Sequence, residues 1–263
     1  MRKFGLIGYP LTHSFSKKYF SDKFTREGKN DCLYDLYEIA NITDLPSIID
    51  AQKELIGINV TIPYKEQVIP YLDNLDPACA AIGAVNCIKL TPQGLVGYNT
   101  DYYGFKTPVN GAFLFHFLFW HPSLSNWLGA EKPKALILGT GGASKAVCQA
   151  LDDLNIPFLK VSRNPDPSSK NTISYEAVKA SPDYLSEYPL IINTTPLGTF
   201  PNVSAMPDLP VSKLNKNNWY YDLVYNPTET AMMTAAEKMG AKTKNGIEML
   251  HLQAEAAWEI WNR

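Results

Sequence analysis

Hydrophobic and polar residues alternate along the first hundred positions with two different periods. Short apolar or alternating runs are typical of strands, and longer segments between them carry apolar residues at the helical period. Strands are expected at residues 4–7, 33–39 and 57–60, and helices at residues 14–27 and 43–54. This order predicts a parallel sheet with helices on its faces.

Two further patterns extend this picture. Residues 85–90 and 94–98, joined by a turn at 92–94, predict a hairpin that adds an antiparallel edge to the sheet. A second α/β pattern begins at Lys134 with a short apolar strand. It continues with a helix at residues 143–154 and strands at residues 158–161, 190–193 and 219–224.

The chain is long enough for two domains. Single hydrophobic cores rarely grow beyond about 250 residues, and this chain has 263. We therefore predict an α/β protein with two α/β domains and a cleft between them. The first comprises residues 1–103 and 242–263 and has a mostly parallel sheet, and the second comprises residues 104–241 and is Rossmann-like.

Composition narrows the possible partners. With 24 basic and 26 acidic residues the net charge is −2, which gives no electrostatic reason to expect nucleic acid or a membrane surface as a partner. The four cysteines have no metal-binding spacing, so we expect reduced thiols in a cytoplasmic protein and no metal site. The start of the chain reads as a strand and not as a signal peptide.

Residues 112–120 are almost all large and apolar. This segment is far shorter than the roughly 20 residues that span a bilayer. We expect a buried or partner-covered helix there. His116 and His121 are five positions apart, which is not the spacing of a paired metal site on a helix, so we interpret both as structural.

Polar residues follow the predicted strands of the first domain. In open α/β sheets ligands bind beyond the carboxyl ends of the strands. Such a set suits a small polyhydroxylated acid, because its hydroxyls and carboxylate need donors and acceptors at fixed positions. For Ser14 a helix N-cap is an equally good interpretation. The set comprises Ser14, Ser16, Thr61, Lys65, Asn86 and Asp101.

Lys65 and Asp101 are candidates for proton transfer. Lys65 follows Pro63 at an expected helix start, where the helix dipole disfavours a cation, so its placement there suggests a functional role. An apolar cofactor nearby would lower the pKa of the amine, and a neighbouring Asp101 would raise it and orient it. Asp101 could equally cap a helix beginning at Tyr102.

The apolar strand before Gly139 leads into a glycine-rich turn and then a helix, which is a device for bringing backbone N–H groups to a dinucleotide's phosphates. The sequence of the turn is Gly139-Thr140-Gly141-Gly142-Ala143-Ser144. It departs from the commonest glycine pattern of dinucleotide-binding turns. After the next strand stands Arg163, where an acidic residue would select NAD. A guanidinium there favours the 2′-phosphate of NADP, although Asp166 is close by.

Eight phrases together resemble the shikimate dehydrogenase family along nearly the whole chain. Cys87 departs from it, because threonine is common there, and Thr199 stands where methionine is frequent. The phrases are Ser14-Phe-Ser16, Asn59-Val-Thr-Ile-Pro-Tyr-Lys65, Gly83-Ala-Val-Asn86, Asn99-Thr-Asp101, Gly139-Thr-Gly-Gly-Ala-Ser144, Asn193-Thr-Thr-Pro-Leu-Gly198, Tyr221-Asp-Leu-Val-Tyr225-Asn-Pro and Asn245-Gly-Ile-Glu-Met-Leu-His-Leu-Gln253.

The resemblance implies reversible NADPH-dependent reduction of 3-dehydroshikimate to shikimate, on the route to chorismate and the aromatic amino acids. It implies that the first domain binds substrate, that the second binds NADP, and that Lys65 and Asp101 form the catalytic pair. The implied substrate-binding residues are Ser14, Ser16, Thr61, Asn86, Tyr225 and Gln253. The implied cofactor-binding residues are Gly139, Thr140, Gly141, Gly142, Ala143, Ser144, Ser162, Arg163, Thr194 and Gly246.

Two alternatives stay open at this point. One is a quinate/shikimate dehydrogenase that uses NAD, which Arg163 disfavours. The other is a non-catalytic binding module with the same fold, against which the presence of both Lys65 and Asp101 argues. Either way we expect a small-molecule substrate and a monomer or homodimer.

Overall fold

The computed structural model describes residues 1–11, 14–106, 124–128 and 130–263. The chain folds into two compact units. Unit 1 comprises Met1–Thr100 with Gln253–Arg263, and unit 2 comprises Asp101–Leu252. The sequence placed these boundaries at 103/104 and 241/242.

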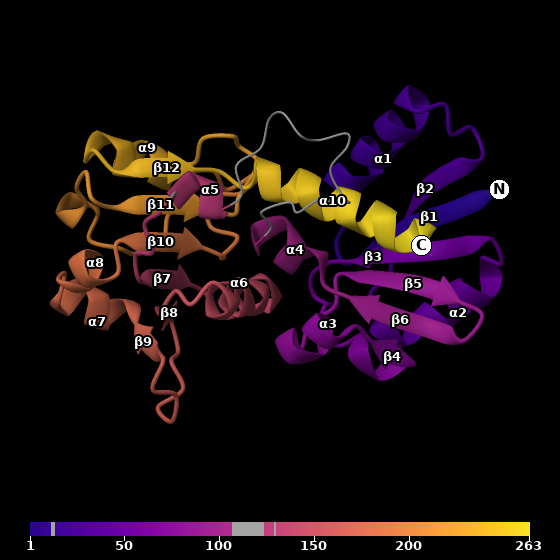
Figure 1. Ribbon diagram of the computed structural model, residues 1–263, viewed down its shortest axis with the longest axis horizontal. Helices are drawn as coiled ribbons and strands as arrows, with labels where there is room; N and C mark the ends of the chain where they lie inside the picture. Colours follow the sequence, from indigo (N-terminus) through magenta and orange to yellow (C-terminus); the bar gives the residue numbers. More distant parts are fainter. Residues whose placement is uncertain (12–13, 107–123, 129) are drawn as a thin grey trace. The chain divides into compact units, whose positions relative to one another are not determined.

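Unit 1 contains a six-stranded sheet in the order β2-β1-β3-β5-β6-β4 (Figure 1). β1 pairs in parallel with β2 and β3, and the predicted hairpin is present as β5 and β6, with β5 antiparallel to β3. The strands are β1 (Arg2–Gly8), β2 (Cys32–Glu38), β3 (Leu55–Val60), β4 (Asn74–Leu75), β5 (Cys87–Thr91) and β6 (Gly94–Tyr98). The helices are α1 (Phe15–Arg26), η1 (Ile42–Asp44), α2 (Leu45–Ala51), η2 (Ile69–Tyr71) and α3 (Pro77–Ile82).

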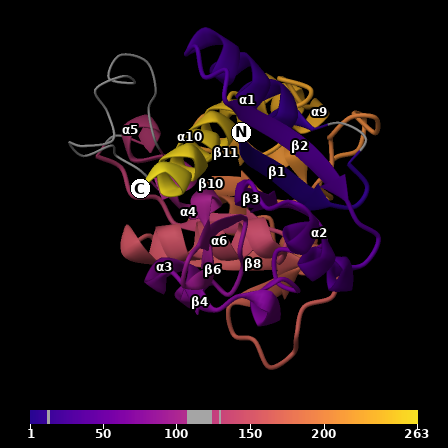
Figure 2. The same ribbon diagram turned by 90° about the vertical axis from the view of Figure 1, so that its right-hand side faces the viewer.

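Alternation along β1 sends side chains to two separate cores. Phe4 lies in an aromatic cluster with residues of α1 and the C-terminal part of α10 (Ile247–Asn262), and both helices pack on this face of the sheet (Figures 1 and 2). Phe4 is stacked on Trp261 with ring centroids 5.0 Å apart. Ile7 points to the opposite face, where Leu45 of α2 covers it. Fully burying one such side chain contributes about 1.5–3 kcal/mol.

Unit 2 contains a six-stranded sheet in which all pairs are parallel, in the order β12-β11-β10-β7-β8-β9. β7 and β10 form the central pair, and the later strands are added on both sides of it. Doubly wound dinucleotide-binding sheets have the same arrangement. The strands are β7 (Ala135–Leu138), β8 (Phe158–Ser162), β9 (Thr172–Ser174), β10 (Leu190–Asn193), β11 (Trp219–Asp222) and β12 (Lys242–Lys244). The remaining helices are α4 (Thr100–Lys106), α5 (Leu124–Leu128), α6 (Gly142–Asp153), α7 (Tyr175–Ala180), α8 (Tyr184–Glu187), η3 (Val211–Lys213) and α9 (Ala231–Lys238).

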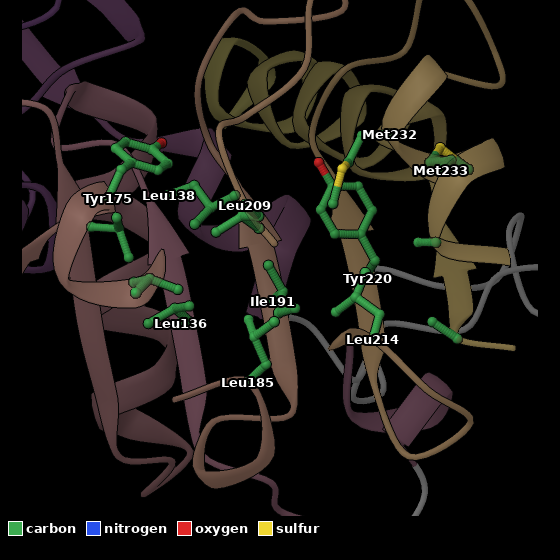
Figure 3. Close-up of a cluster of buried hydrophobic side chains, with 14 residues drawn as sticks. Leu136, Leu138, Tyr175, Leu185, Ile191, Leu209, Leu214, Tyr220, Met232 and Met233 are labelled. Carbon is green, nitrogen blue, oxygen red and sulfur yellow. The ribbon is translucent and has the colours of Figure 1, made fainter. Parts of the chain in front are cut away.

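One face of this sheet carries a core formed with α7, α8 and α9. Leu136, Ile191 and Tyr220 project from β7, β10 and β11, and Figure 3 shows Met232 of α9 beside the Tyr220 ring. The next residue along β11, Tyr221, points to the opposite face. There it stacks on Phe105 of α4 and contacts Trp127 of α5.

The helix expected at Pro63 is absent. Residues 62–68 form successive turns instead. The Lys65 carbonyl accepts a hydrogen bond from the Val85 N–H at 2.7 Å, and the Ile69 N–H, its helical donor four residues on, binds the Glu66 carbonyl instead. The prediction of Lys65 at a helix start was therefore wrong, and the dipole argument for its function fails. The apolar segment 112–120, with His116 and His121, lies outside the described residues.

Within the described ranges, no helix has the length and apolar character that crossing a bilayer requires.

Candidate active site

The first sheet reverses its winding between β1 and β3, which lie side by side. Ser14 and Ser16 follow β1, and Thr61 follows β3. The backbones join here, because the Thr61 N–H donates to the Ile7 carbonyl at 3.0 Å. Such switch points are where open α/β sheets bind ligands, so these three predicted residues occupy a suitable place.

Ser14 and Ser16 are set by the start of α1. Ser14 is the N-cap, and its hydroxyl oxygen accepts from the Lys17 N–H at 3.3 Å. Its own proton remains able to donate to a ligand, so capping and ligand binding are compatible. Ser16 is the second residue of α1.

Asn86 is buried and connects three parts of unit 1. Its side-chain oxygen accepts from the Thr100 N–H at 2.6 Å and from the Thr100 hydroxyl at 3.2 Å. Its amide nitrogen donates to the Gln253 side-chain oxygen at 3.1 Å. Two predicted substrate-binding residues, 167 positions apart in the chain, are thereby brought into direct contact.

Tyr34 and Asn59 extend this contact further into unit 1. The Tyr34 hydroxyl donates to the Asn59 side-chain oxygen at 2.8 Å, and the Asn59 amide donates to the Asn86 carbonyl at 3.3 Å. Burial raises the pKa of Tyr34 well above its usual value, so its proton is retained. A continuous network therefore runs from Tyr34 through Asn59 to Asn86 and Gln253.

The backbones at Lys65 and just before Asp101 are anchored to the same short segment. The Val85 N–H binds the Lys65 carbonyl, and Asn86 binds the Thr100 N–H. Asp101 is the next residue, a buried side chain in the first turn of α4. It therefore does not cap a helix beginning at Tyr102. The meeting of the Lys65 amine with the Asp101 carboxylate stays a prediction.

In unit 2 the glycine-rich turn joins β7 to α6. Gly139 has φ +105°, a conformation that L side chains rarely adopt. Gly141 is the N-cap of α6 and has no side chain with which to cap the first turn. Ser144 instead donates to the Gly139 carbonyl at 2.9 Å. The N-terminus of α6 can thus present N–H groups to an anion, as a pyrophosphate site requires.

Thr194 lies directly beside this turn. Its N–H and its hydroxyl both donate to the Leu138 carbonyl, at 3.0 and 2.6 Å. A Cβ on Gly139 would lie 2.9 Å from the Thr194 hydroxyl oxygen. Residues after β7 and after β10 therefore meet at the switch point of the second sheet, and the predicted residues Thr140, Gly142 and Ala143 belong to the same turn.

Ser162 and Arg163 are at the end of β8. The Ser162 hydroxyl accepts from the Asn164 N–H at 3.2 Å, which fixes the turn, and Arg163 is exposed. Asp166, the acidic residue nearby, uses one carboxylate oxygen to accept from the Ser168 N–H and hydroxyl. The Ser168 backbone hydrogen bond lowers the pKa of Asp166. Arg163 is therefore the side chain at this strand end with a charge suited to a phosphate.

Gly246 and Tyr225 belong to the opposite part of the sheet. The Gly246 N–H donates to the Val224 carbonyl at 3.0 Å, and a Cβ on Gly246 would lie 2.2 Å from the Leu223 carbonyl oxygen. Gly246 follows β12 and Arg163 follows β8, and β11, β10 and β7 lie between those two strands. Neighbouring strands are about 4.8 Å apart, so the two residues belong to strand ends roughly 19 Å apart, and only an extended ligand can reach both.

Three comparisons identify relatives. Residues 6–88 match the model of the shikimate dehydrogenase substrate binding domain. The shikimate dehydrogenase (NADP(+)) of Clostridium beijerinckii is 37% identical over 269 residues, which cover 99% of this chain and 92% of the relative.

This chain belongs to the shikimate dehydrogenase family.

Solved structures of the family have the same fold. The crystal structure of shikimate dehydrogenase 1 from Peptoclostridium difficile is similar with a TM-score of 0.80 at 34% identity, covering 100% of this chain and 92% of that one. Shikimate 5-dehydrogenase from Thermus thermophilus, crystallised in complex with NADP(H) and shikimate, has a TM-score of 0.80 at 27% identity, covering 99% and 93%. The two-domain, Rossmann-like α/β prediction is confirmed.

Cys87, which departs from the family pattern, does not bear on ligand binding directly. Its side chain is fully buried in the aromatic core of unit 1. Burial raises the pKa of its thiol, so it behaves as a small apolar side chain. This departure therefore lies in the hydrophobic core of unit 1.

Tyr34 and Asn59 were not assigned a role from the sequence, and their contribution is testable. Tyr34→Phe removes the hydroxyl that donates to Asn59. We expect a loss of about 1–3 kcal/mol in the free energy of unfolding, because a part-buried acceptor loses its donor. Because Asn59 holds the backbone of Asn86, a proposed substrate-binding residue, the KM for 3-dehydroshikimate should rise roughly threefold to tenfold. Chemical denaturation and steady-state kinetics measure the two effects.

Tyr37 provides the matched control, three residues further along β2. Its hydroxyl is buried, and it has no hydrogen-bond partner among the described residues. Tyr37→Phe should therefore leave stability and KM unchanged or raise stability slightly. Equal effects of the two substitutions would contradict the role of the Tyr34 network.

Proposed function

We propose that this protein catalyses the reversible NADPH-dependent reduction of 3-dehydroshikimate to shikimate, a reaction of aromatic amino acid biosynthesis. The observation that carries the proposal is the connected polar set beside the switch point of the first sheet, where Asn59, Asn86 and Gln253 are joined by hydrogen bonds. Family membership and the relative crystallised with shikimate and NADP(H) support it.

The catalytic role falls to Lys65 and Asp101. NADPH supplies a hydride when bound, and the carbonyl carbon of the substrate accepts it with its electron pair. The Lys65 ammonium donates a proton to the carbonyl oxygen, which becomes the hydroxyl of shikimate, and Lys65 then regains a proton from solvent. General-acid catalysis of this kind contributes about 10²–10⁴-fold. Asp101 orients the amine and binds a neighbouring hydroxyl.

The substrate's groups fit the polar residues of unit 1. Ser14 can donate to the carboxylate, because its oxygen already accepts from the Lys17 N–H and its proton is available. Asn86 and Gln253, already bonded to each other, would hold ring hydroxyls. Thr61 and Tyr225 complete the proposed substrate contacts.

The residues of unit 2 fit NADP. The turn from Gly139 to Ser144 offers backbone N–H groups at the start of a helix, which suits a pyrophosphate. Arg163 would hold the 2′-phosphate, and Ser162 the adjoining ribose. Thr194 and Gly246 would contact the nicotinamide half. An NAD-dependent quinate/shikimate dehydrogenase is not favoured, because the strand end that selects between the cofactors carries an exposed guanidinium.

Absorbance at 340 nm, a wavelength at which NADPH absorbs and NADP does not, tests the function directly. NADPH should be consumed only when 3-dehydroshikimate is present, and shikimate with NADP should run the reaction backwards. Quinate and NAD, tested in the same way, should give much lower kcat/KM values. NADPH binding without any turnover would contradict the proposal and favour a non-catalytic binding module.

Arg163→Ala should discriminate between the two cofactors. It removes a charge-assisted contact to the 2′-phosphate, which NADH lacks, so the KM for NADPH should rise about tenfold or more while that for NADH changes little. Initial rates with each cofactor measure the ratio. Equal losses for NADPH and NADH would refute the assignment of Arg163 to the 2′-phosphate.

We also propose that the protein acts in the cytoplasm as a monomer or homodimer. Its four cysteines are free thiols, which suits a reducing compartment. Light scattering of the purified protein would give its mass in solution.

A further inference from the structure

Asp222 is a fully buried carboxylate at the end of β11. Burial raises its pKa, and hydrogen bonds from Thr230, Val224 and Asn193 act in the opposite direction. Among the residues that the structure describes, its hydrogen-bond partners are neutral. Burying a charged carboxylate costs several kcal/mol of folding free energy unless its oxygens accept hydrogen bonds. The four hydrogen bonds to Asp222 are therefore needed to keep this group buried.

The four donors approach both oxygens. The Asn193 amide and the Val224 N–H donate to one oxygen at 2.9 and 3.0 Å. The Thr230 hydroxyl donates to the other at 2.7 Å, with the Tyr220 hydroxyl at 3.4 Å. An asparagine at position 222 would keep the shape and offer one acceptor oxygen in place of two.

Asn193 passes the effect of Asp222 to the loop after β10. Because Asp222 binds its nitrogen, the Asn193 oxygen faces the opposite way. That oxygen accepts from the Thr195 N–H at 3.0 Å and from the Thr195 hydroxyl at 2.6 Å. The conformation of the loop that begins with Thr194 thus depends on which way Asn193 points.

Val224 connects Asp222 to the loops after β11 and β12. With its N–H held by Asp222, the Val224 carbonyl accepts from the Gly246 N–H at 3.0 Å. Gly246 packs so closely on Leu223 that a Cβ would lie 2.2 Å from the Leu223 carbonyl oxygen. Tyr225 is the next residue after Val224.

Thr230 holds the other end of the loop that joins β11 to α9. It is the N-cap of α9, so its hydroxyl oxygen accepts from the Met233 N–H at 3.3 Å while the hydroxyl donates to Asp222. The ends of β10, β11 and α9 are therefore connected through one carboxyl group, and loops with three proposed ligand-binding residues, Thr194, Tyr225 and Gly246, diverge from it.

We propose that Asp222 is the positioning residue of the nicotinamide half of the cofactor site. In the Rossmann order the glycine turn and Arg163 belong to the adenosine half, so β10, β11 and β12 provide the other half. This inference rests on the proposed function. A small displacement of the ring that delivers the hydride lowers the rate steeply, whereas the adenosine and pyrophosphate contacts still hold the cofactor.

Asp222→Asn should therefore lower kcat while changing NADPH affinity little. We expect a fall in kcat of about 10–100-fold, which is the scale for misplacement by about an ångström. The dissociation constant of adenosine 2′,5′-bisphosphate should stay within a factor of about two of the wild-type value. The primary isotope effect on kcat, measured with NADPH deuterated at the transferred position, should rise because hydride transfer becomes the slow step.

Asn218 is the control at the opposite end of the same strand. It is buried, its amide donates to the Leu185 carbonyl at 2.7 Å, and its oxygen accepts from the Asn215 N–H at 2.9 Å. Asn218→Ala should lower the melting temperature but leave kcat and the isotope effect unchanged. If Asp222→Asn likewise lowers only the melting temperature, Asp222 has a structural role only and the proposal is overturned.

Thr230→Val and Thr230→Ser form a second pair if Asp222→Asn does not fold. Valine removes the hydroxyl that donates to Asp222, and serine keeps it. The inference predicts a lower kcat for Thr230→Val and recovery in Thr230→Ser, and equal kcat values for the two would overturn it. Wild-type protein that binds adenosine 2′,5′-bisphosphate but never consumes NADPH would instead mean that the proposed function has failed.

Discussion

Replacing Lys65 by alanine is expected to lower kcat by about 10²–10⁴-fold, because the proton donor to the substrate's carbonyl oxygen is lost. Binding of NADPH should be unchanged, since Lys65 belongs to unit 1 and the proposed cofactor residues to unit 2. Initial rates at saturating substrate measure kcat, and quenching of protein fluorescence measures NADPH binding.

Lys53→Ala is the control for removing a lysine from unit 1. Lys53 is exposed and lies outside the polar set at the switch point, so its removal should leave kcat unchanged. An unchanged kcat in Lys65→Ala would remove Lys65 from the mechanism, whatever the effect of Lys53→Ala.

Asp101→Asn shows whether the amine and the carboxylate act together. If Asp101 works by orienting Lys65, the variant carrying both substitutions should be no slower than Lys65→Ala alone, because residues that act as a unit are not additive. Independent roles would instead multiply the two losses. The comparison of four kcat values therefore tests the pairing that the sequence predicts.

Periodic patterns predicted the longer strands of both units because strand and helix signals there are local, whereas the short edge strands β4, β9 and β12 were not predicted. The hairpin at β5 and β6 follows from two apolar runs separated by a turn, and the strand before Gly139 is a run of buried residues. The helix expected at Pro63 fails for a non-local reason. The Lys65 carbonyl binds Val85, twenty positions away, and no periodicity at residues 62–68 reveals that partner.

The supporting residues were missed for the same reason. Tyr34 binds Asn59 across 25 positions, and Asn193 binds Asp222 across 29. In the sequence Tyr34 is one more apolar position of an alternating strand, and Asp222 is one acidic residue among many. The sequence therefore indicates which groups could touch a ligand, whereas only the fold reveals which groups hold them in place.

The glycine-rich turn offers a pair of substitutions that separates the needs of the fold from those of the cofactor. Gly139 has φ +105°, and a Cβ there would lie 2.9 Å from the Thr194 hydroxyl oxygen and 3.1 Å from the Thr195 methyl carbon. Gly139→Ala should therefore destabilise unit 2 by about 1–3 kcal/mol or more, since both the backbone and the contacts become strained. Thermal denaturation would detect this loss.

Gly141→Ala should have the opposite signature. Gly141 has φ −77°, which alanine adopts readily, and apart from the adjoining residues no described atom lies within 4 Å of a Cβ built there. Its melting temperature should match that of the wild type. The added methyl group would nevertheless stand at the N-terminus of α6, where the pyrophosphate is proposed to approach the backbone. Losing a hydrogen bond to a charged group costs about 1.5–3 kcal/mol, so the dissociation constant of NADPH should rise about 10–100-fold.

Gly139 is therefore expected to matter for stability, and Gly141 for NADPH affinity. Measuring both properties distinguishes a turn that only connects β7 to α6 from one that also binds the cofactor. A turn that serves only to connect β7 to α6 would tolerate Gly141→Ala with no change in NADPH affinity, which would contradict the phosphate site. A turn that binds the cofactor through its backbone must lose affinity at Gly141 while keeping stability. This follows because, apart from the adjoining residues, no described atom lies within 4 Å of the methyl group, so the expected obstruction is to the pyrophosphate.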